Sequence, residues 1–135
     1  MDITEAIDYV RGNNRAVLAT KRRDGTPQMS PVTLAVLENQ VVMSTRETAY
    51  KVANLRRDPR AWLCVFPDGW YGQWIQLGCT AQVASLPDAM GNLVEYYRTL
   101  RGEHPDWDDY RRAMSDDLRC LVSFDVLTAG PNLSG

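Results

Sequence analysis

Five apolar runs typical of β-strands follow one another early in this 135-residue chain, separated by short turns and one short helix. The runs cover residues 15–20, 27–36, 41–44, 61–66 and 70–84. Parallel neighbours need crossover connections of a dozen or more residues, which the tight turns at Asp24-Gly25 and Glu38-Asn39 do not provide. This order predicts an antiparallel barrel rather than a doubly wound parallel sheet.

Helical patterns flank these runs. They cover residues 3–12, 49–57, 87–102 and 105–114, and a last strand is predicted over 119–126, followed by a Gly- and Pro-rich tail. We expect Gly72 and Gly78 to bend or bulge the fifth strand. Residues 1–135 are therefore predicted to form a single domain, mostly β with α, built as a six-stranded antiparallel split β-barrel with flanking helices.

Charge and hydropathy exclude several classes of function. The formal net charge is −2, which argues against general nucleic-acid binding, because that requires a clustered basic face. No apolar stretch is long enough to span a membrane, and no leader sequence is recognisable, so we expect a cytoplasmic protein that does not bind membranes.

Cysteine and arginine usage adds two expectations. Cys64, Cys79 and Cys120 show no pairing pattern and lie in apolar runs, so they are predicted to be buried thiols of a reducing compartment. Thirteen arginines stand against two lysines, a bias typical of GC-rich genomes such as those of actinobacteria.

The segment from residue 44 to residue 51 carries the chemistry of an anion site. Hydroxyls of Ser44 and Thr45, cations of Arg46 and Lys51, and backbone amides of a helix N-terminus are predicted to converge there. Residues 46–60 hold five cations and two anions, a surplus that suits an anionic ligand. A solvated helix face with ordinary capping explains the same residues equally well at this stage.

The segment also resembles a known family. Lys51 and residues 54–61, NLRRDPRA, are similar to the K-x-x-N-L-R-R-D-P-R-A signature of the pyridoxamine 5′-phosphate oxidase-like (PPOX class) split barrels. The resemblance is narrower to their actinobacterial branch, which binds the deazaflavin coenzyme F-420. It continues through residues 25–30, 68–70, 78–81 and 102–111, and covers the chain from about residue 6 to residue 124.

The resemblance implies site residues and a partner. Lys51, Ser44 and Gln28 match positions that contact the cofactor phosphate or its linker, and the strand wall from Gln28 through Ser30 to Val32 would face the ring. It also implies a homodimer with the cofactor at the subunit interface. Relatives often carry an arginine where this chain has Ala49, and Arg46 is our candidate for the missing charge.

Aromatic residues are the remaining candidates for the cofactor pocket. Trp70 and Trp74 lie near the turn into the fifth strand and could stack on a planar ring, although barrel tryptophans are more often core or interface residues. With His104 as its one histidine, the chain cannot form a three-histidine zinc site. Relatives usually carry a polar or charged residue just before the glycine of the fifth strand, where this chain has Leu77. We expect this difference to affect the substrate side of the pocket.

These observations support three functional hypotheses. The first is a coenzyme F-420-dependent oxidoreductase that transfers a hydride between reduced deazaflavin and an unsaturated small-molecule substrate. The second is an FMN-binding oxidase or reductase of the same fold, because both cofactors carry a phosphate after a ribityl-type chain. The third is a non-catalytic flavin- or deazaflavin-binding protein. Hydride transfer needs no acid–base set of its own, because the cofactor carries the chemistry.

Overall fold

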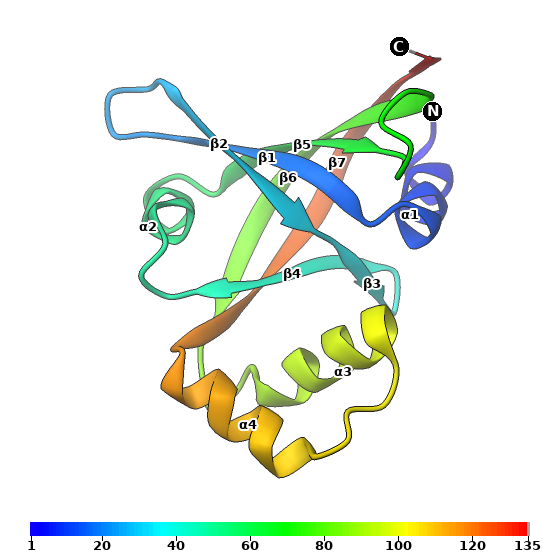
Figure 1. The fold of residues 1–135 in the computed structure, drawn as a ribbon. Coiled ribbons are helices and arrows are strands. Elements are labelled where there is room, and N and C mark those ends of the chain that lie inside the picture. The colour runs from blue at the N-terminus through cyan, green and yellow to red at the C-terminus, as the bar shows by residue number, and fades with distance from the viewer. Residues whose placement is uncertain (135) are drawn as a thin grey trace.

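The computed structural model describes residues 1–134 and contains one antiparallel sheet with four helices around it (Figure 1). The elements in chain order are α1 (Ile3–Gly12), β1 (Arg15–Lys21), β2 (Pro27–Thr33), β3 (Ala35–Leu37), β4 (Gln40–Arg46), α2 (Tyr50–Arg57), β5 (Arg60–Phe66), β6 (Gln73–Ala84), α3 (Met90–Arg101), α4 (Trp107–Asp116) and β7 (Arg119–Ser134). The strand order is β2-β1-β5-β6-β7-β4-β3. The predicted antiparallel architecture is confirmed in this curled sheet.

The described chain has seven strands, so the prediction of six was wrong at one point. The expected strand over residues 27–36 is broken at Leu34, whose N–H donates to Asn14 O at 2.7 Å and whose carbonyl accepts from Asn14 Nδ2 at 2.9 Å. Before this break the chain pairs with β1, and after it with β4. The change of partner carries the chain from one part of the curled sheet to the other.

Two other strand boundaries also differ from prediction. The expected fifth strand starts at Gln73 rather than Trp70, because Trp70 lies in a turn with φ +72° and its N–H donates to Pro67 O. The last strand runs on to Ser134, because backbone that we expected to be a tail pairs with β6. The register shift beside Gly78 confirms a bulge there.

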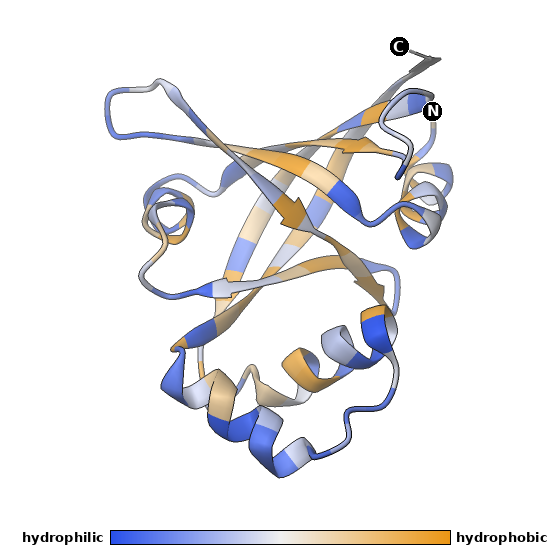
Figure 2. Cartoon of the chain, in the orientation of Figure 1, coloured by the Kyte–Doolittle hydropathy of each residue, from blue (hydrophilic) through white to orange (hydrophobic). Residues whose placement is uncertain are grey.

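The core fills the inside of the curled sheet. Strand β5 shows how, since Ala61, Leu63 and Val65 are buried whereas the alternating Trp62, Cys64 and Phe66 face outward. Helix α1 packs at the open end of the sheet, and α3 with α4 forms a second apolar cluster against β3, β4 and β7 (Figures 1 and 2). No helix within residues 1–134 combines the length and hydropathy that a bilayer crossing requires.

Candidate functional site

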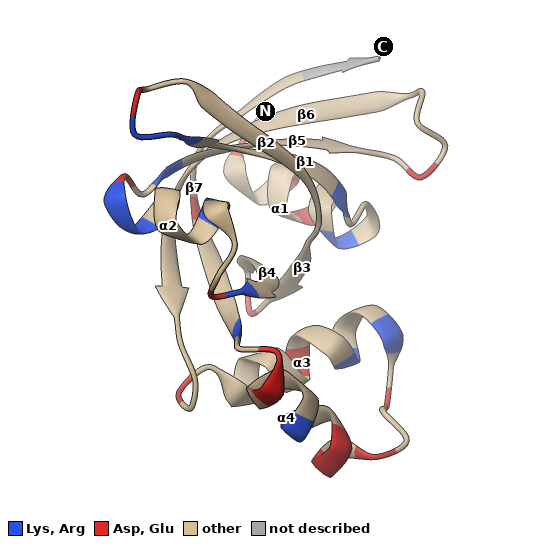
Figure 3. Cartoon of the chain, turned by 60° about the vertical axis from the view of Figure 1, so that its left-hand side comes forward, with Lys and Arg blue, Asp and Glu red and all other residues tan. Residues whose placement is uncertain are grey.

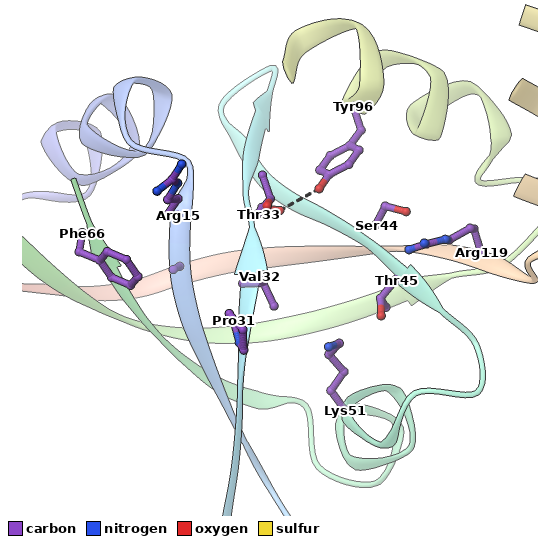
Figure 4. Close-up of a pocket in the computed structure, with 11 residues that line it drawn as sticks. Arg15, Pro31, Val32, Thr33, Ser44, Thr45, Lys51, Phe66, Tyr96 and Arg119 are labelled. Atoms are coloured by element: carbon purple, nitrogen blue, oxygen red, sulfur yellow. Dashed lines mark hydrogen bonds between the residues drawn. The ribbon is translucent and has the colours of Figure 1, made fainter. Parts of the chain in front are cut away.

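A cavity of about 450 Å³ lies where β4 leads into α2 and β2 passes beside them (Figure 4). It is lined by Arg15, Ala16, Pro31, Val32, Thr33, Ser44, Thr45, Lys51, Phe66, Tyr96 and Arg119. Figure 4 shows Lys51, Thr45 and Arg119 on one side of β2, with Arg15 and Phe66 on the other. The cavity is therefore a groove that crosses this strand.

Lys51 projects into the groove from the first turn of α2. Its Nζ donates to Ser30 Oγ on β2 at 3.2 Å, and its side chain is half-buried. Burial, and secondarily the positive charge of Arg119, lowers the pKa of Lys51 from its ordinary value of 10.5. An anion in the groove would meet an ammonium that has already lost part of its water, where an ionic hydrogen bond is strongest.

Strand β4 adds hydroxyl donors to the same wall. Thr45 is buried and extends toward Lys51 in Figure 4, and Ser44 precedes it in the lining. The N-cap of α2 is Ala49, which has no side chain that can cap the helix, and within the first turn the N–H of Val52 donates to Ala49 O at 3.0 Å. Two hydroxyls and one ammonium from residues 44–51 thus line the same groove. That they bind an anion there stays a prediction.

Arg46 and Gln28 lie outside the lining. Arg46 is exposed and its NH2 lies 3.2 Å from Asp117 Oδ1. Gln28 is half-buried on the same side of β2 as Ser30, and its Oε1 accepts from Thr20 Oγ1 at 3.3 Å. The contacts of Arg46 and Gln28 with a cofactor stay predictions.

The two candidate tryptophans line a second, apolar cavity of about 360 Å³ on the outer side of β1 and β5. Its lining is Val17, Cys64, Phe66, Trp70, Tyr71, Gly72 and Trp74. The two cavities share Phe66, against which Trp70 packs edge to face with ring centroids 5.5 Å apart. Stacking of Trp70 or Trp74 on a cofactor stays a prediction.

Not all of the cysteines are buried. Cys79 and Cys120 are buried, and burial raises their pKa values to about 12 and about 11. Cys64 is exposed, which contradicts the prediction, because the alternation of β5 turns it to the outer face of the sheet. The apolar run around it therefore marks a strand, β5, that is apolar on both faces.

Sequence reasoning missed several residues of the groove, among them Arg119 and Tyr96. Arg119 begins β7 and Tyr96 lies on α3, and neither belongs to a motif that suggested an anion. Arg119 faces Arg46 in the β4–β7 pairing, a neighbour relationship that only the strand register reveals. Leu77, by contrast, is fully buried in the barrel core and contributes no surface to either cavity.

Comparison with known proteins agrees with this geometry. The family model described as pyridoxamine 5′-phosphate oxidase matches residues 3–125. The chain belongs to the pyridoxamine 5′-phosphate oxidase family. The curled antiparallel sheet is consistent with this membership.

Solved structures share the fold of this pyridoxamine 5′-phosphate oxidase family member at low identity. A conserved hypothetical protein, Rv2991 of Mycobacterium tuberculosis, is 22% identical with a TM-score of 0.78, covering 100% of this chain and 92% of that one. An F420 reductase is 16% identical with a TM-score of 0.70, covering 91% and 94%. HutZ, the haem storage protein of Vibrio cholerae, is 13% identical with a TM-score of 0.73, covering 100% and 98%.

Proposed function

We propose that this protein is a coenzyme F-420-dependent oxidoreductase that transfers a hydride between the reduced deazaflavin and an unsaturated small molecule. The observation that carries the proposal is the groove beside α2, where Lys51, Ser44 and Thr45 offer donors to a phosphate. An F420 reductase of the same fold, and the similarity of residues 51–61 to the deazaflavin-binding branch, support this choice of cofactor.

The chemistry of the lining fits a phosphorylated cofactor. Arg15, Lys51 and Arg119 line the groove, and no carboxylate does so within the described chain. Lys51 would hold the phosphate together with the hydroxyls of Ser44 and Thr45. When bound, the deazaflavin supplies the hydride chemistry, and the protein positions it and excludes water.

The groove continues from this anion end toward the place for a ring. Beyond Val32 and Thr33 on β2 the groove reaches Phe66, which also forms part of the apolar cavity of Trp70 and Trp74. A planar ring that extends from the phosphate would follow β2 in this direction. The apolar cavity would then lie beside the ring and accept an apolar, unsaturated substrate.

FMN is the second candidate cofactor. The family is described as pyridoxamine 5′-phosphate oxidase, and a phosphomonoester carries two negative charges near neutral pH, which suits a groove with three cations. A non-catalytic binding protein is the third candidate, because a haem storage protein has the same fold. A cytoplasmic, actinobacterial protein would have access to either cofactor.

A second copy of the chain would complete the site. Large apolar side chains are exposed on β2 (Met29), on β7 (Leu127) and in the turn before β6 (Trp70 and Tyr71), and each is 60% or more exposed. Exposed apolar surface of this kind is typical of an interface. We propose a homodimer in which this surface is covered and the partner closes the groove over the cofactor.

Titration of the purified protein with F-420 and with FMN tests the choice of cofactor. We expect tight, saturable binding of F-420 and oxidation of its reduced form with a subset of enones and quinones. Tight copurification of FMN would contradict the leading proposal in favour of the second. Binding of F-420 without turnover over such a panel would favour the non-catalytic protein.

Sedimentation of the wild type and of Cys64→Glu tests the dimer. Cys64 lies at the exposed side of β5, so a carboxylate there would be buried without a partner in the proposed interface. We expect a wild-type dimer and a monomeric variant, with Ala113→Glu on the exposed surface of α4 as the matched control. A monomeric wild type at micromolar concentration would contradict the dimer.

A further inference from the structure

Arg119 gives the groove a second cationic wall, opposite the one formed by α2. Its side chain is 29% exposed and extends from β7 toward Ser44 and Thr45 (Figure 4). Nε donates to Asp117 Oδ2 at 2.9 Å, whereas the two terminal nitrogens donate to no residue in the described part of the chain. One edge of the guanidinium is therefore anchored, and its other nitrogens are available to a ligand.

Asp117 holds two arginines but directs them differently. Arg46 and Arg119 face each other in the β4–β7 pairing, and each contacts a different oxygen of Asp117. Arg46 is 59% exposed and lies outside the lining, whereas Arg119 lies within it. Like charges on paired strands repel, and the carboxylate offsets this repulsion while it fixes the Nε edge of Arg119. Asp117 is thus a positioning residue for Arg119.

The charges around the groove are unbalanced. Lys51 and Arg119 enter it from separate elements, and the lining contains no carboxylate within the described chain. Lys and Arg residues also occur along α2 and on the β1–β2 hairpin (Figure 3). Two cations that face one partly buried space repel each other, and a ligand with two negative charges relieves this repulsion better than one with a single charge.

We propose that Arg119 binds a second negative charge of the ligand whose first charge is bound by Lys51. The inference rests on the proposed function in taking that ligand to be the phosphorylated cofactor. The second charge has two chemical sources: the second ionised oxygen of a phosphomonoester such as FMN, or a carboxylate attached to a phosphodiester such as F-420. The planar guanidinium suits both, because it donates two parallel hydrogen bonds.

The affinities of wild type and Arg119→Gln, measured at about pH 5 and about pH 7.5, test the inference and separate the two sources. A phosphomonoester gains its second charge near pH 6. For FMN, we expect Arg119→Gln to weaken binding about tenfold or more at the higher pH and much less at the lower pH. For F-420, whose phosphodiester and carboxylates are ionised at both values, we expect an equal loss at both.

The protein groups around Arg119 do not confuse this comparison. Hydrogen bonds from Arg46 and Arg119 keep the pKa of Asp117 below its ordinary 3.8, so it stays ionised. Burial raises the pKa of Tyr96 above its ordinary 10.0, so its hydroxyl stays protonated at both pH values. Lys51 is present in both wild type and Arg119→Gln, so its contribution is common to the two proteins. The pH dependence therefore reports the phosphate.

Two further variants show whether the position of the charge matters. Arg111→Gln and Arg112→Gln each remove one cation from the exposed surface of α4. We expect both to bind cofactor within about twofold to threefold of wild type. An effect of either variant as large as that of Arg119→Gln would overturn the inference.

The remaining outcomes distinguish this inference from the proposed function. Wild-type affinity of Arg119→Gln for the bound cofactor, at both pH values, overturns the inference alone. If the wild type binds neither cofactor, the proposed function fails, and pyrophosphate becomes the probe. We expect pyrophosphate to raise the melting temperature of the wild type more than that of Arg119→Gln. An equal rise in both proteins overturns the inference. If Arg119→Gln does not fold, Arg119→Lys replaces it. We then expect a smaller loss of cofactor affinity than for Arg119→Gln, and an affinity equal to that of the wild type would overturn the inference.

Discussion

Asn54 on α2 donates through Nδ2 to the hydroxyl of Thr20 on β1 across 3.1 Å, inside the protein. The Thr20 hydroxyl in turn donates to Gln28 Oε1 on β2, and Arg57 donates to Asn54 Oδ1 at 2.9 Å. This chain of polar groups fixes the helix that carries Lys51 against the two strands beside the groove. The asparagine of the NLRR motif therefore has a structural role that is separate from cofactor binding.

Thr20→Val is expected to destabilise the protein although it keeps the shape of the side chain. The substitution leaves the buried Asn54 amide without its partner, and an unsatisfied buried donor costs about 1–3 kcal/mol. Urea unfolding measures this loss in the free energy of unfolding. Thr99→Val, at an exposed position of α3, is the matched control and should be near neutral. Equal stabilities of the two variants would show that the buried bond contributes nothing.

Glu47 connects the loop before α2 to the segment before α3. Its carboxylate pairs with Arg56 at 2.8 Å and accepts from Ser85, and these bonds, that of Arg56 first, lower the pKa of Glu47 from 4.5. A carboxyl group whose pKa is lowered on folding stabilises the protein above its unfolded pKa, and the contribution is lost as the pH falls through the folded pKa.

Glu47→Gln should therefore lower the melting temperature at pH 7, and its difference from the wild type should shrink as the pH falls below 4.5 and through the folded pKa. Because Arg56 is 48% exposed and screened by solvent, we expect only about 0.5–1 kcal/mol at neutral pH. Glu38→Gln, at an exposed turn, controls for the change in net charge. A difference that persists unchanged in acid would mean that the ion pair is not its source.

Cofactor affinity should begin to fall at a lower pH than it would for a lysine with the ordinary pKa of 10.5. Burial and Arg119 lower the pKa of Lys51 from 10.5, so its ammonium loses the proton, and with it the ionic hydrogen bond, below that value. Dissociation constants measured from about pH 7 to about pH 10 should rise in the wild type and stay flat in Lys51→Arg, which keeps its charge. A flat wild-type profile would show that Lys51 is not the group that binds the anion.

Much of the fold follows from local signals. The turn at Glu38-Asn39 adopts φ values of 48° and 66°, the left-handed conformation that a tight hairpin needs, and the alternation along β5 separates core from surface. The break at Leu34 was not predictable, because it depends on hydrogen bonds to Asn14, a residue distant in sequence. Strand order, like the length of β7, depends on such distant pairings.

The candidate site was predictable where one segment supplies it and not where distant segments meet. Lys51, Ser44 and Thr45 are close in sequence, and all three line the groove because β4 leads directly into α2. Arg119 reaches the groove because β7 pairs with β4, and the sequence does not reveal this pairing. The sequence pointed instead to Arg46, which follows Thr45 in the chain. Charge patterns locate an anion site along the chain, whereas the strand register decides which cations face it.

The affinity of Lys51→Ala for FMN and F-420, measured beside its affinity for riboflavin, tests whether Lys51 binds the cofactor phosphate. Riboflavin has the ring and chain of FMN but no phosphate, so it separates the anion site from the rest of the pocket. We predict that the variant loses about 1.5–3 kcal/mol of binding free energy for a phosphorylated cofactor and almost nothing for riboflavin. Equal affinities of wild type and variant for both phosphorylated cofactors would contradict this prediction.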